Sequence, residues 1–367
     1  MSNARNLANL LGTGTQITTA DIADGAFQAN KNLIINGAMQ VAQRGTTASG
    51  LSSIGFNTVD RFNGNSATAG SFAVTDEQSS DAPAGFNYSR KLTFTTAQTT
   101  SAGTRNQVRH HIEGYNTAHL DWGTADAKTV TLSFWVKSSV TGSMAVAFIN
   151  QTETHSYVTD YTVSSANTWE YKTIVVEGPT VGAWNTNNTI GIRLSWDLGS
   201  GSTYQTPTSD AWVSGWYYRT SSSVRPTETL NATWQITGVQ LEIGDTATPF
   251  EHRSFGEELA LCQRYYQTLT VLNTTYSAAI SYTGGSNAVL PTTNFSTMRA
   301  APSVTFDSSG NIEYFNGSAW ADTTVSAQDT TDNYTVIIAS GAGIVSKGSL
   351  IRADQGVPLN ALLDAEL

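Results

Sequence analysis

Apolar residues alternate with other residues through most of residues 31–250, and this period-two pattern limits the fold more than any other feature. Three rows illustrate it: Leu132, Phe134 and Val136; Met144, Val146 and Phe148; and Ile190, Ile192, Leu194 and Trp196. Side chains two positions apart share one face of a strand, so these rows predict half-buried strands. Turn residues separate the rows and no long amphipathic helix interrupts them, which indicates an all-β fold, a β-sandwich.

One predicted strand changes parity along its length. Trp234 and Ile236 occupy even positions, but the apolar residues from Val239 onward occupy odd ones. The change falls at Thr237 and Gly238, where we expect a β-bulge, because an extra residue in one strand shifts the alternation by one.

A short helix is predicted at 254–268. Ser254 and Glu257 form an S-x-x-E capping box. Leu259, Cys262 and Tyr266 then lie along one stripe of the helix. Other apolar residues flank this stripe, so we expect the helix to be buried against more than one neighbour. A symmetry axis and a domain junction both meet that requirement.

The chain divides into four predicted parts. Residues 1–30 form an arm, residues 31–250 the sandwich, residues 251–269 the linker helix and residues 270–367 a smaller C-terminal β domain. In the last part, Asn316-Gly317 follows an alternating segment and predicts a hairpin. Its tail, from Val357 to Leu367, is interpreted as a final helical turn because it contains three leucines at helical spacing.

The arm carries Leu7, Leu10 and Leu11 at helical spacing, followed by Gly12. A single helical turn is too short to be stable alone in water. We therefore expect the arm to be ordered by docking on another protein. The alternative is a segment that packs on its own chain. The N-terminus lacks the charged and apolar regions of a secretory signal, so none is expected.

Composition excludes several classes of function. Only 13% of the residues are charged, against about 25% in ordinary globular domains. The net charge of −10 argues against a nucleic-acid partner, and no apolar run is long enough to cross a membrane. Thr and Ser supply roughly a quarter of the chain, which fits strands with small polar faces. Cys262 is the only cysteine, so no internal disulfide and no multi-cysteine metal site is expected.

No catalytic motif stands out, and we expect no enzyme, no cofactor and no metal site. His110 and His111 are adjacent on a predicted strand, so they point to opposite faces and cannot easily share a metal ion. Glycoside cleavage needs two carboxylates at a fixed separation. The chain offers Glu153, Asp160, Glu170, Glu177 and Asp197, which is no more than any β protein of this size supplies.

Aromatic residues supply the candidate ligand-binding sites, because sugars stack on aromatic faces and bond to amides, carboxylates and arginines. The densest cluster contains Trp212, Trp216, Tyr218 and Arg219. Trp184, flanked by asparagines, is a second candidate. The alternative is that the tryptophans of the cluster belong to the core or to an interface.

Three sets of motifs are recognisable. They are Asn32-Leu-Ile-Ile-Asn-Gly37 with Val41-Ala-Gln-Arg-Gly45 and Val59-Asp-Arg-Phe62; Ser133-Phe-Trp-Val-Lys-Ser138 with Thr168-Trp-Glu-Tyr171; and Thr237-Gly-Val-Gln-Leu-Glu-Ile-Gly244 with the residues that follow to Tyr266. Together they resemble a group of bacteriophage tail-fibre and virion structural proteins. The first motif and the closing Val-x-Leu strand also resemble family four and nine carbohydrate-binding modules, which are jelly-rolls.

The resemblance to carbohydrate-binding modules has one departure. Those modules often follow the Asn-Gly pair with an acidic residue that helps hold a structural calcium, whereas here Asn36 and Gly37 are followed by Ala38. Hard cations favour carboxylate oxygens, so we expect no calcium at this position. Asp60 is a possible substitute but is more simply interpreted as a local ion pair with Arg61.

The resemblance implies a tail-fibre protein in the virion that binds a polysaccharide or other receptor on the host surface. Residues 1–30 would attach it to another virion protein. A homotrimer is expected, with Leu259, Cys262 and Tyr266 near the threefold axis, because three copies can cover a wide apolar helix face that one sandwich cannot. The alternatives are a head-fibre, decoration or tail-adaptor protein without receptor binding, and a soluble carbohydrate-binding module of cellular origin.

Overall fold

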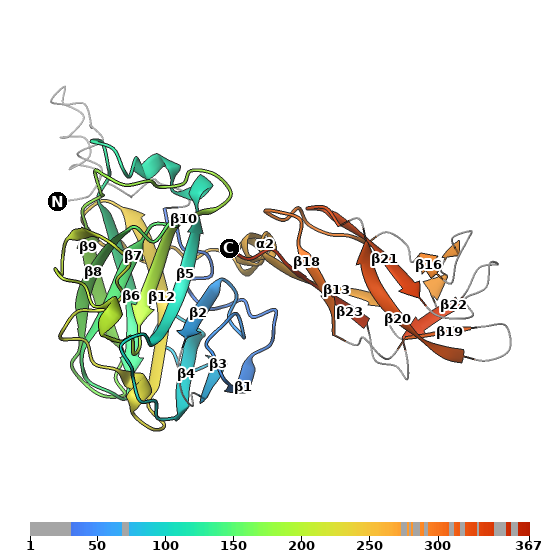
Figure 1. Ribbon diagram of the computed structural model, residues 1–367, viewed down its shortest axis with the longest axis horizontal. Coiled ribbons are helices and arrows are strands. Elements are labelled where there is room, and N and C mark those ends of the chain that lie inside the picture. Colours follow the sequence, from blue (N-terminus) through green and yellow to red (C-terminus); the bar gives the residue numbers. More distant parts are fainter. Residues whose placement is uncertain are drawn as a thin grey trace, which may run out of the picture.

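A computed structural model describes most of the chain from residue 31 to its end (Figure 1). The described ranges are 31–67, 73–272, 277–278, 280–281, 287–289, 293–307, 312–315, 320–328, 330–340, 350–353 and 359–367. The predicted arm 1–30, with Leu7, Leu10 and Leu11, lies outside them. None of the helices in these ranges is long and apolar enough to cross a membrane.

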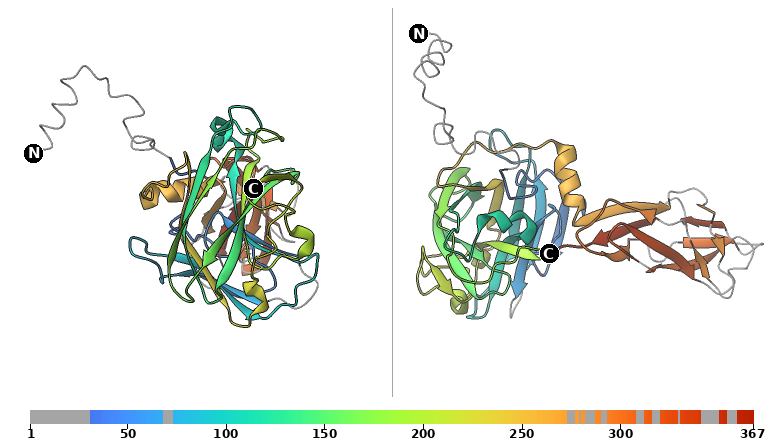
Figure 2. Two further views of the ribbon diagram at one scale, coloured as in Figure 1. Left: turned by 90° about the vertical axis from the view of Figure 1, so that its left-hand side faces the viewer. Right: turned by 90° about the horizontal axis from the view of Figure 1, so that it is seen from above.

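Two six-stranded antiparallel sheets form the predicted jelly-roll sandwich (Figures 1 and 2). The first, called the β12 sheet, has the strand order β1 (Thr47–Leu51), β3 (Ala73–Ser79), β4 (Ser89–Thr96), β12 (Thr233–Ile243), β6 (Val130–Ser138), β9 (Glu170–Val176). The second, called the β10 sheet, has the order β11 (Trp212–Ser214), β8 (His155–Val163), β7 (Gly142–Ile149), β10 (Ile190–Asp197), β5 (Arg105–Glu113), β2 (Phe62–Ala67). Short 3-10 turns lie at Gly114–Asn116, Ala118–Leu120, Ser202–Tyr204 and Pro226–Glu228.

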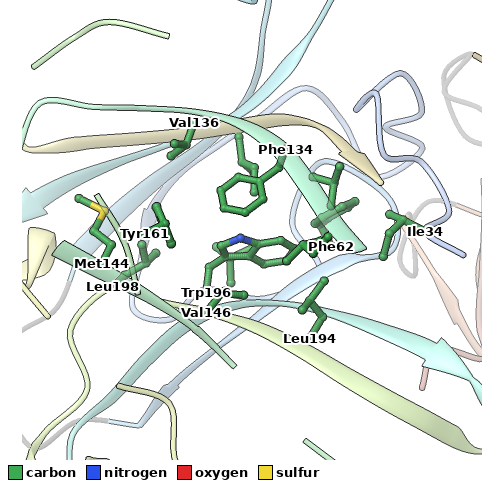
Figure 3. Close-up of a cluster of buried hydrophobic side chains, with 14 of the residues drawn as sticks. Ile34, Phe62, Phe134, Val136, Met144, Val146, Tyr161, Leu194, Trp196 and Leu198 are labelled. Atoms are coloured by element: carbon green, nitrogen blue, oxygen red, sulfur yellow. The ribbon is translucent and has the colours of Figure 1, made fainter. Parts of the chain in front are cut away.

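The core lies between these sheets and contains the residues of the period-two rows. Leu132, Phe134 and Val136 of β6 are fully buried, as are the rows of β7 and most of the row of β10 (Figure 3). Trp196 lies at the centre, with its ring centroid 5.8 Å from that of Phe134. The alternation of the sequence therefore predicted which side of each strand faces inward.

The predicted bulge in β12 is confirmed. The register of β12 against β6 shifts between Thr237 and Gln240, so odd-numbered residues face the core beyond that point. Gly238 sits in the bulge with φ +61°, a conformation that glycine adopts without strain. A Cβ atom there would also lie 2.6 Å from the Phe86 ring, so the position excludes a side chain on two grounds.

The single described α-helix, α2 (Phe255–Gln263), begins with the predicted capping box and ends earlier than predicted. The Ser254 side chain accepts from the Glu257 backbone N–H, and Glu257 accepts from the Ser254 N–H. Because β13 (Tyr266–Leu272) begins immediately, Tyr266 belongs to a strand.

The prediction that Cys262 and Tyr266 face a threefold axis is wrong. Both side chains are buried within this chain. Cys262 packs with Tyr265 against Ile35 and Val41 of the sandwich. Leu259 is only partly buried beside this cluster. The helix is therefore covered by a domain junction, which is one of the two arrangements that its wide apolar arc allowed.

Beyond α2 the chain forms a β projection that extends away from the sandwich (Figures 1 and 2). A three-stranded sheet at its base has the order β13, β23 (Leu359–Asp364), β18 (Ser303–Phe306). The described strands farther out are β14 (Ser277–Ala278), β15 (Ile280–Ser281), β16 (Asn287–Val289), β17 (Thr293–Asn294), β19 (Ile312–Phe315), β20 (Trp320–Gln328), β21 (Tyr334–Ser340) and β22 (Leu350–Ala353). Phe315 of β19 pairs with Trp320 of β20, so two antiparallel strands flank Asn316-Gly317 as predicted, while the turn residues themselves lie outside the described ranges.

The tail is a strand and not the predicted helical turn. Leu359, Ala361 and Leu363 of β23 are buried on one face, so the effective period is two. Leu362 lies on the other face of the strand. Its i, i+3 spacing from Leu359 is also typical of a helix, which led to the wrong prediction. Pairing with both β13 and β18 gives the tail hydrogen-bonding partners that a lone helical turn would lack.

The two ends of the projection meet at its base. Tyr266, where the chain leaves the sandwich, pairs with Asp364, where it returns. The last three residues then lie against the sandwich, and Ala365 N donates to Tyr265 O at 2.8 Å. The C-terminus consequently lies at the junction between the sandwich and the projection (Figure 2).

Charged side chains fill this junction. Arg61 is buried, forms an ion pair with Glu366 and lies 3.5 Å from the Tyr265 ring centroid. Arg44 reaches Glu366 at 3.5 Å from the other side. Burial raises the pKa of Glu366, while the two arginines oppose that rise. The junction thus holds an ionised group only because its partners are fixed in place.

A second set of contacts ties the projection to the sandwich. Glu113 at the end of β5 accepts from Arg264 at 2.6 Å and from the Tyr265 hydroxyl at 2.7 Å. Burial raises the pKa of Glu113, but the bonds from these partners outweigh it and hold the pKa below its usual range. Arg299 of the projection donates to Asn188 O at 2.8 Å and to Ala365 O at 2.6 Å.

Replacing Arg61 by Met should destabilise the chain strongly, because Glu366 keeps only Arg44 as a close cationic partner. Removing one member of a buried ion pair costs about 3–5 kcal/mol. Since Arg44 remains, we expect about 3 kcal/mol of the free energy of unfolding to be lost, measured by urea denaturation.

Lys91→Met is the control for this variant. It breaks the ion pair of Lys91 with Glu77, which spans 3.2 Å on a partly exposed surface of the sandwich. We expect a loss below about 1 kcal/mol. Equal losses in the two variants would contradict a special role for the junction.

Candidate functional site

The structure separates the predicted ligand-binding residues into two groups. Trp184 and Trp212 lie side by side with ring centroids 5.3 Å apart, and Trp122 completes a cluster of three tryptophans. Trp216 and Tyr218 lie in a different cluster with Tyr204. The single site suggested by their closeness in sequence does not form.

The indole N–H groups of the tryptophan cluster are all bound within the chain. Trp122 donates to Lys128 O at 2.8 Å, Trp184 to Val181 O at 3.2 Å and Trp212 to Glu177 O at 2.8 Å. Trp122 is buried, while Trp184 and Trp212 are partly buried against the core. These bonds fix the orientation of the rings and leave ring surface as the part that a ligand can contact.

A pocket of about 250 Å³ lies beside Trp184. Its lining residues are Thr117, Ala118, Leu120, Asp121, Trp122, Thr124, Trp184, Asn185, Thr186 and Ile192. Two loops form most of it, the 3-10 turns after β5 and the segment before β10. The loops approach so closely at Gly114 that a Cβ there would lie 2.5 Å from Asn185 O, so glycine is required.

The lining of the Trp184 pocket includes a carboxylate, an amide and a hydroxyl group. The Asp121 carboxylate pairs with Lys128 at 3.1 Å, and both side chains are more than 40% exposed. Asn185 donates to Thr189 Oγ1 at 2.9 Å and also contacts Gln151. Thr186 is exposed at the rim. An indole face beside a carboxylate, an amide and hydroxyl groups is an arrangement that binds an uncharged polyhydroxylated ring.

Tyr218 and Arg219 are wrongly predicted as ligand contacts. Tyr218 is 0% exposed and its hydroxyl accepts from Arg109 at 2.7 Å. Arg219 is 3% exposed and donates to the backbone oxygens of Ser200 at 3.2 Å and Ser223 at 2.9 Å. Both are buried where the segment 199–224 folds back over the outer face of the β10 sheet, so they fix that segment.

Trp216 and Trp212 are both partly buried, with different surroundings. Trp216 packs on Tyr204, and the Arg105 guanidinium lies 5.0 Å from its ring centroid. Trp212 pairs with Tyr157 across β11 and β8 and packs against the main core. Trp212 therefore contacts both the core and Trp184, and it packs edge-to-face against the Trp184 ring.

An aromatic pocket of about 400 Å³ on the outer face of the β12 sheet escaped the sequence analysis. Trp135 and Tyr171 lie opposite each other on β6 and β9, with ring centroids 5.3 Å apart. Phe86, Phe250 and His252 form its other wall. The sequence did carry one indication of this pocket. Trp135 alternates with the core residues of its strand and shares a face with Ser133 and Lys137, which predicts that it points outward.

The histidines of β5 face opposite sides of the sheet, as predicted. His110 packs on Phe62, with ring centroids 4.8 Å apart, while His111 Nδ1 donates to Leu367 O at 2.8 Å. Burial lowers the pKa of both imidazoles well below the usual value, and neighbouring Arg61 and Arg193 contribute. Among the described residues, no group of three or more His, Cys, Asp or Glu side chains could hold a metal ion.

The Asn36 region is held by backbone contacts. The Asn36 amide donates to Val41 O at 2.8 Å and Asp60 O at 2.9 Å, and its oxygen accepts from Val41 N. Asp60 accepts from Gln43 and lies 3.8 Å from Arg44, which is a different ion pair from the expected one with Arg61.

The carboxylates considered for catalysis are mostly bound to near neighbours. Asp160 accepts from the hydroxyls of Thr220 and Ser222, and Glu170 pairs with Lys172 at 2.6 Å. Glu153 pairs with Arg193. Asp197 accepts from Ser200 N at 2.9 Å, and complete burial raises its pKa to about 6.

Comparison with known proteins gives structural likenesses only. No protein-family model and no curated protein sequence matches the chain. An enzymatically active domain of tailspike protein 4 from bacteriophage CBA120 is 13% identical over 58% of this chain, with a TM-score of 0.30. This chain covers 22% of that tailspike.

Two sugar-binding proteins are also similar. A putative sugar-binding protein of Bacteroides thetaiotaomicron is 11% identical, with 58% of this chain and 100% of that chain covered and a TM-score of 0.32. The family 11 carbohydrate-binding module of Clostridium thermocellum, solved with a mixed-linked tetrasaccharide, is 11% identical over 55% of this chain and 98% of its own, with a TM-score of 0.27. At such TM-scores we draw no functional conclusion from these likenesses.

Replacing Asp197 by Asn should raise the melting temperature at pH 7.5. The folded-state pKa of about 6 exceeds the usual 3.8, so ionisation of the buried acid above pH 6 destabilises the fold. The introduced amide carries no charge, and its oxygen can still accept from Ser200 N. The difference between variant and wild type should shrink at pH 5, where wild-type Asp197 is largely protonated. A variant that melts lower than wild type at pH 7.5 would contradict this assignment.

Proposed function

We propose that this chain is a structural protein of a bacteriophage tail fibre that binds a glycan of the host surface. The observation that carries the binding claim is the pocket beside Trp184, where a fixed indole, the Asp121 carboxylate and the Thr186 hydroxyl surround a space of about 250 Å³. A sugar ring offers a C–H face to the indole and hydroxyls to the polar groups. The proposal is binding without cleavage.

The shape and composition of the chain support a fibre role. The sandwich and the β projection form an elongated unit with a tightly bonded junction (Figure 2). A surface with few charges and many Thr and Ser residues suits an extracellular structural protein. In this proposal residues 1–30 attach to another virion protein through Leu7, Leu10 and Leu11, and the projection forms the distal tip.

The proposed homotrimer now rests on the outer face of α2. Phe255 is 56% exposed, and Leu259, one turn later, is only partly buried. This pair offers an apolar surface that a second copy can cover. Cys262 contributes indirectly, because it packs the helix against Ile35 and Val41 of the sandwich.

Trp184→Ala should weaken binding to arrayed bacterial surface polysaccharides by at least about tenfold, because truncating a partly desolvated tryptophan removes the main stacking surface. Thr186→Val, an exposed substitution at the rim, should weaken binding without affecting the melting temperature. Trp169→Ala is the matched control, since Trp169 directly precedes β9 of the β12 sheet, is not among the residues that line the pocket, and donates to Asp81.

Unchanged binding by both pocket variants would overturn the pocket assignment. Absence of wild-type binding to every polysaccharide and to bacterial cells would overturn the receptor claim. That second result would instead favour a head-fibre, decoration or tail-adaptor protein with a purely structural role.

Phe255→Ser should reduce the mass measured by light scattering from three 39.1 kDa chains to one. The control is Leu230→Ser, because Leu230 is 59% exposed elsewhere on the sandwich. A wild-type protein that is monomeric at all concentrations would contradict the trimer.

A further inference from the structure

Three arginines lie on the outer face of the β10 sheet, away from the core. Arg105 and Arg109 come from β5, and Arg193 comes from the adjacent strand β10. In the antiparallel register Ser195 lies directly opposite Arg109, and Arg109 lies opposite Asn63 of β2. These residues, called the arginine face below, form one surface across three neighbouring strands.

Two other parts of the chain border the arginine face. On one side the segment 199–224 lies over the sheet, and the Tyr218 hydroxyl accepts from Arg109 at 2.7 Å. On the other side the C-terminal residue Leu367 binds His111, which lies opposite Arg193 in the register. The face is therefore set between two fixed walls.

Several polar atoms of the arginine face are buried without a hydrogen-bond partner. They are Nε of Arg105, Arg109 and Arg193, Oγ of Ser195 and Oδ1 of Asn63. Arg109 is 6% exposed, Arg193 8% and Ser195 0%. Leaving a buried polar group unpaired costs free energy, about 1–3 kcal/mol for each group. So many on one surface point to a ligand that supplies the missing partners.

The charge on this face is unbalanced. The charges of Arg193 and Arg105 repel the Arg109 guanidinium, and the charge of Glu153 attracts it. Burial and the two neighbouring arginines lower the pKa of Arg109 to about 10. Of the two carboxylates nearby, Glu153 is paired with Arg193, whereas Asp197 accepts from Ser200 N through Oδ1 and its Oδ2 is buried without a hydrogen-bond partner. In a chain of net charge −10, this local excess of positive charge needs an explanation.

We propose that the arginine face binds the anionic group of an acidic sugar, a carboxylate or a phosphate carried on a polyhydroxylated ring. The guanidinium N–H groups require an acceptor, and an anion is the strongest one. Asn63 Oδ1 requires a donor, which a sugar hydroxyl supplies. Ser195 Oγ can either donate or accept a hydrogen bond. A ligand that combines an anion with hydroxyl groups meets all three requirements.

The test measures binding of trigalacturonate, its methyl ester and glucose 1-phosphate to the full-length protein by calorimetry. We expect at least one anionic probe to bind about tenfold or more tightly than the neutral ester, and its affinity to fall with added salt. Preference for trigalacturonate identifies a carboxylate, and preference for glucose 1-phosphate identifies a phosphate.

Two variants locate the binding. Arg193→Gln should weaken the preferred anionic probe about tenfold or more, and Ser195→Ala, which removes a hydroxyl without a partner, should weaken it by a smaller factor. Lys91→Gln removes the same charge from the other sheet and should have no effect. Equal binding of the ester and both anions, absence of binding by both anions, or wild-type affinity in folded Arg193→Gln would each overturn the proposal.

The test of the arginine face can succeed or fail independently of the test of the Trp184 pocket. The pocket and the arginine face share no residue. Loss of anion binding in Arg193→Gln with an intact response to neutral polysaccharides would assign two sites to one sandwich.

Discussion

The buried charges at the junction are the interaction on which the rest of the structure depends. Arg61 and Arg44 hold Glu366 at the end of the chain, and Arg264 holds Glu113 at the end of β5. Ions in a buried setting are tolerated only with partners in fixed positions. Only 13% of the residues are charged, and several of them meet at this junction, which gives the chain a defined orientation between its two parts. Apolar packing alone would leave this orientation less specific.

The junction also determines the geometry of the candidate sites. Arg299 of the projection donates to Asn188 O, and Asn188 belongs to the loop that carries Trp184 and Asn185. The C-terminal residue Leu367 binds His111 at the edge of the arginine face. Both surfaces therefore contain a segment that the projection fixes. A host contact at the projection and a glycan contact on the sandwich would be held in one relative orientation.

Local patterns in the sequence predicted the sandwich, the bulge at Gly238 and the capping box at Ser254, because each depends on neighbouring residues alone. Errors arose where distant segments decide the outcome. The tail is a strand because β13 and β18 offer it partners. Tyr218 and Arg219 are buried because residues 199–224 fold over the β10 sheet. The arginine face was missed because register across three strands, and not spacing along one, brings Arg109, Ser195 and Asn63 together.

The central claim is that the charged junction holds the sandwich and the projection as one rigid unit. The most direct measurement is the distribution of distances between two spin labels, one at exposed Leu230 on the sandwich and one at exposed Thr305 on the projection. The account predicts a single narrow distribution in the wild type, which broadens in Arg61→Met and stays narrow in Lys91→Met. A broad distribution in the wild type would contradict it.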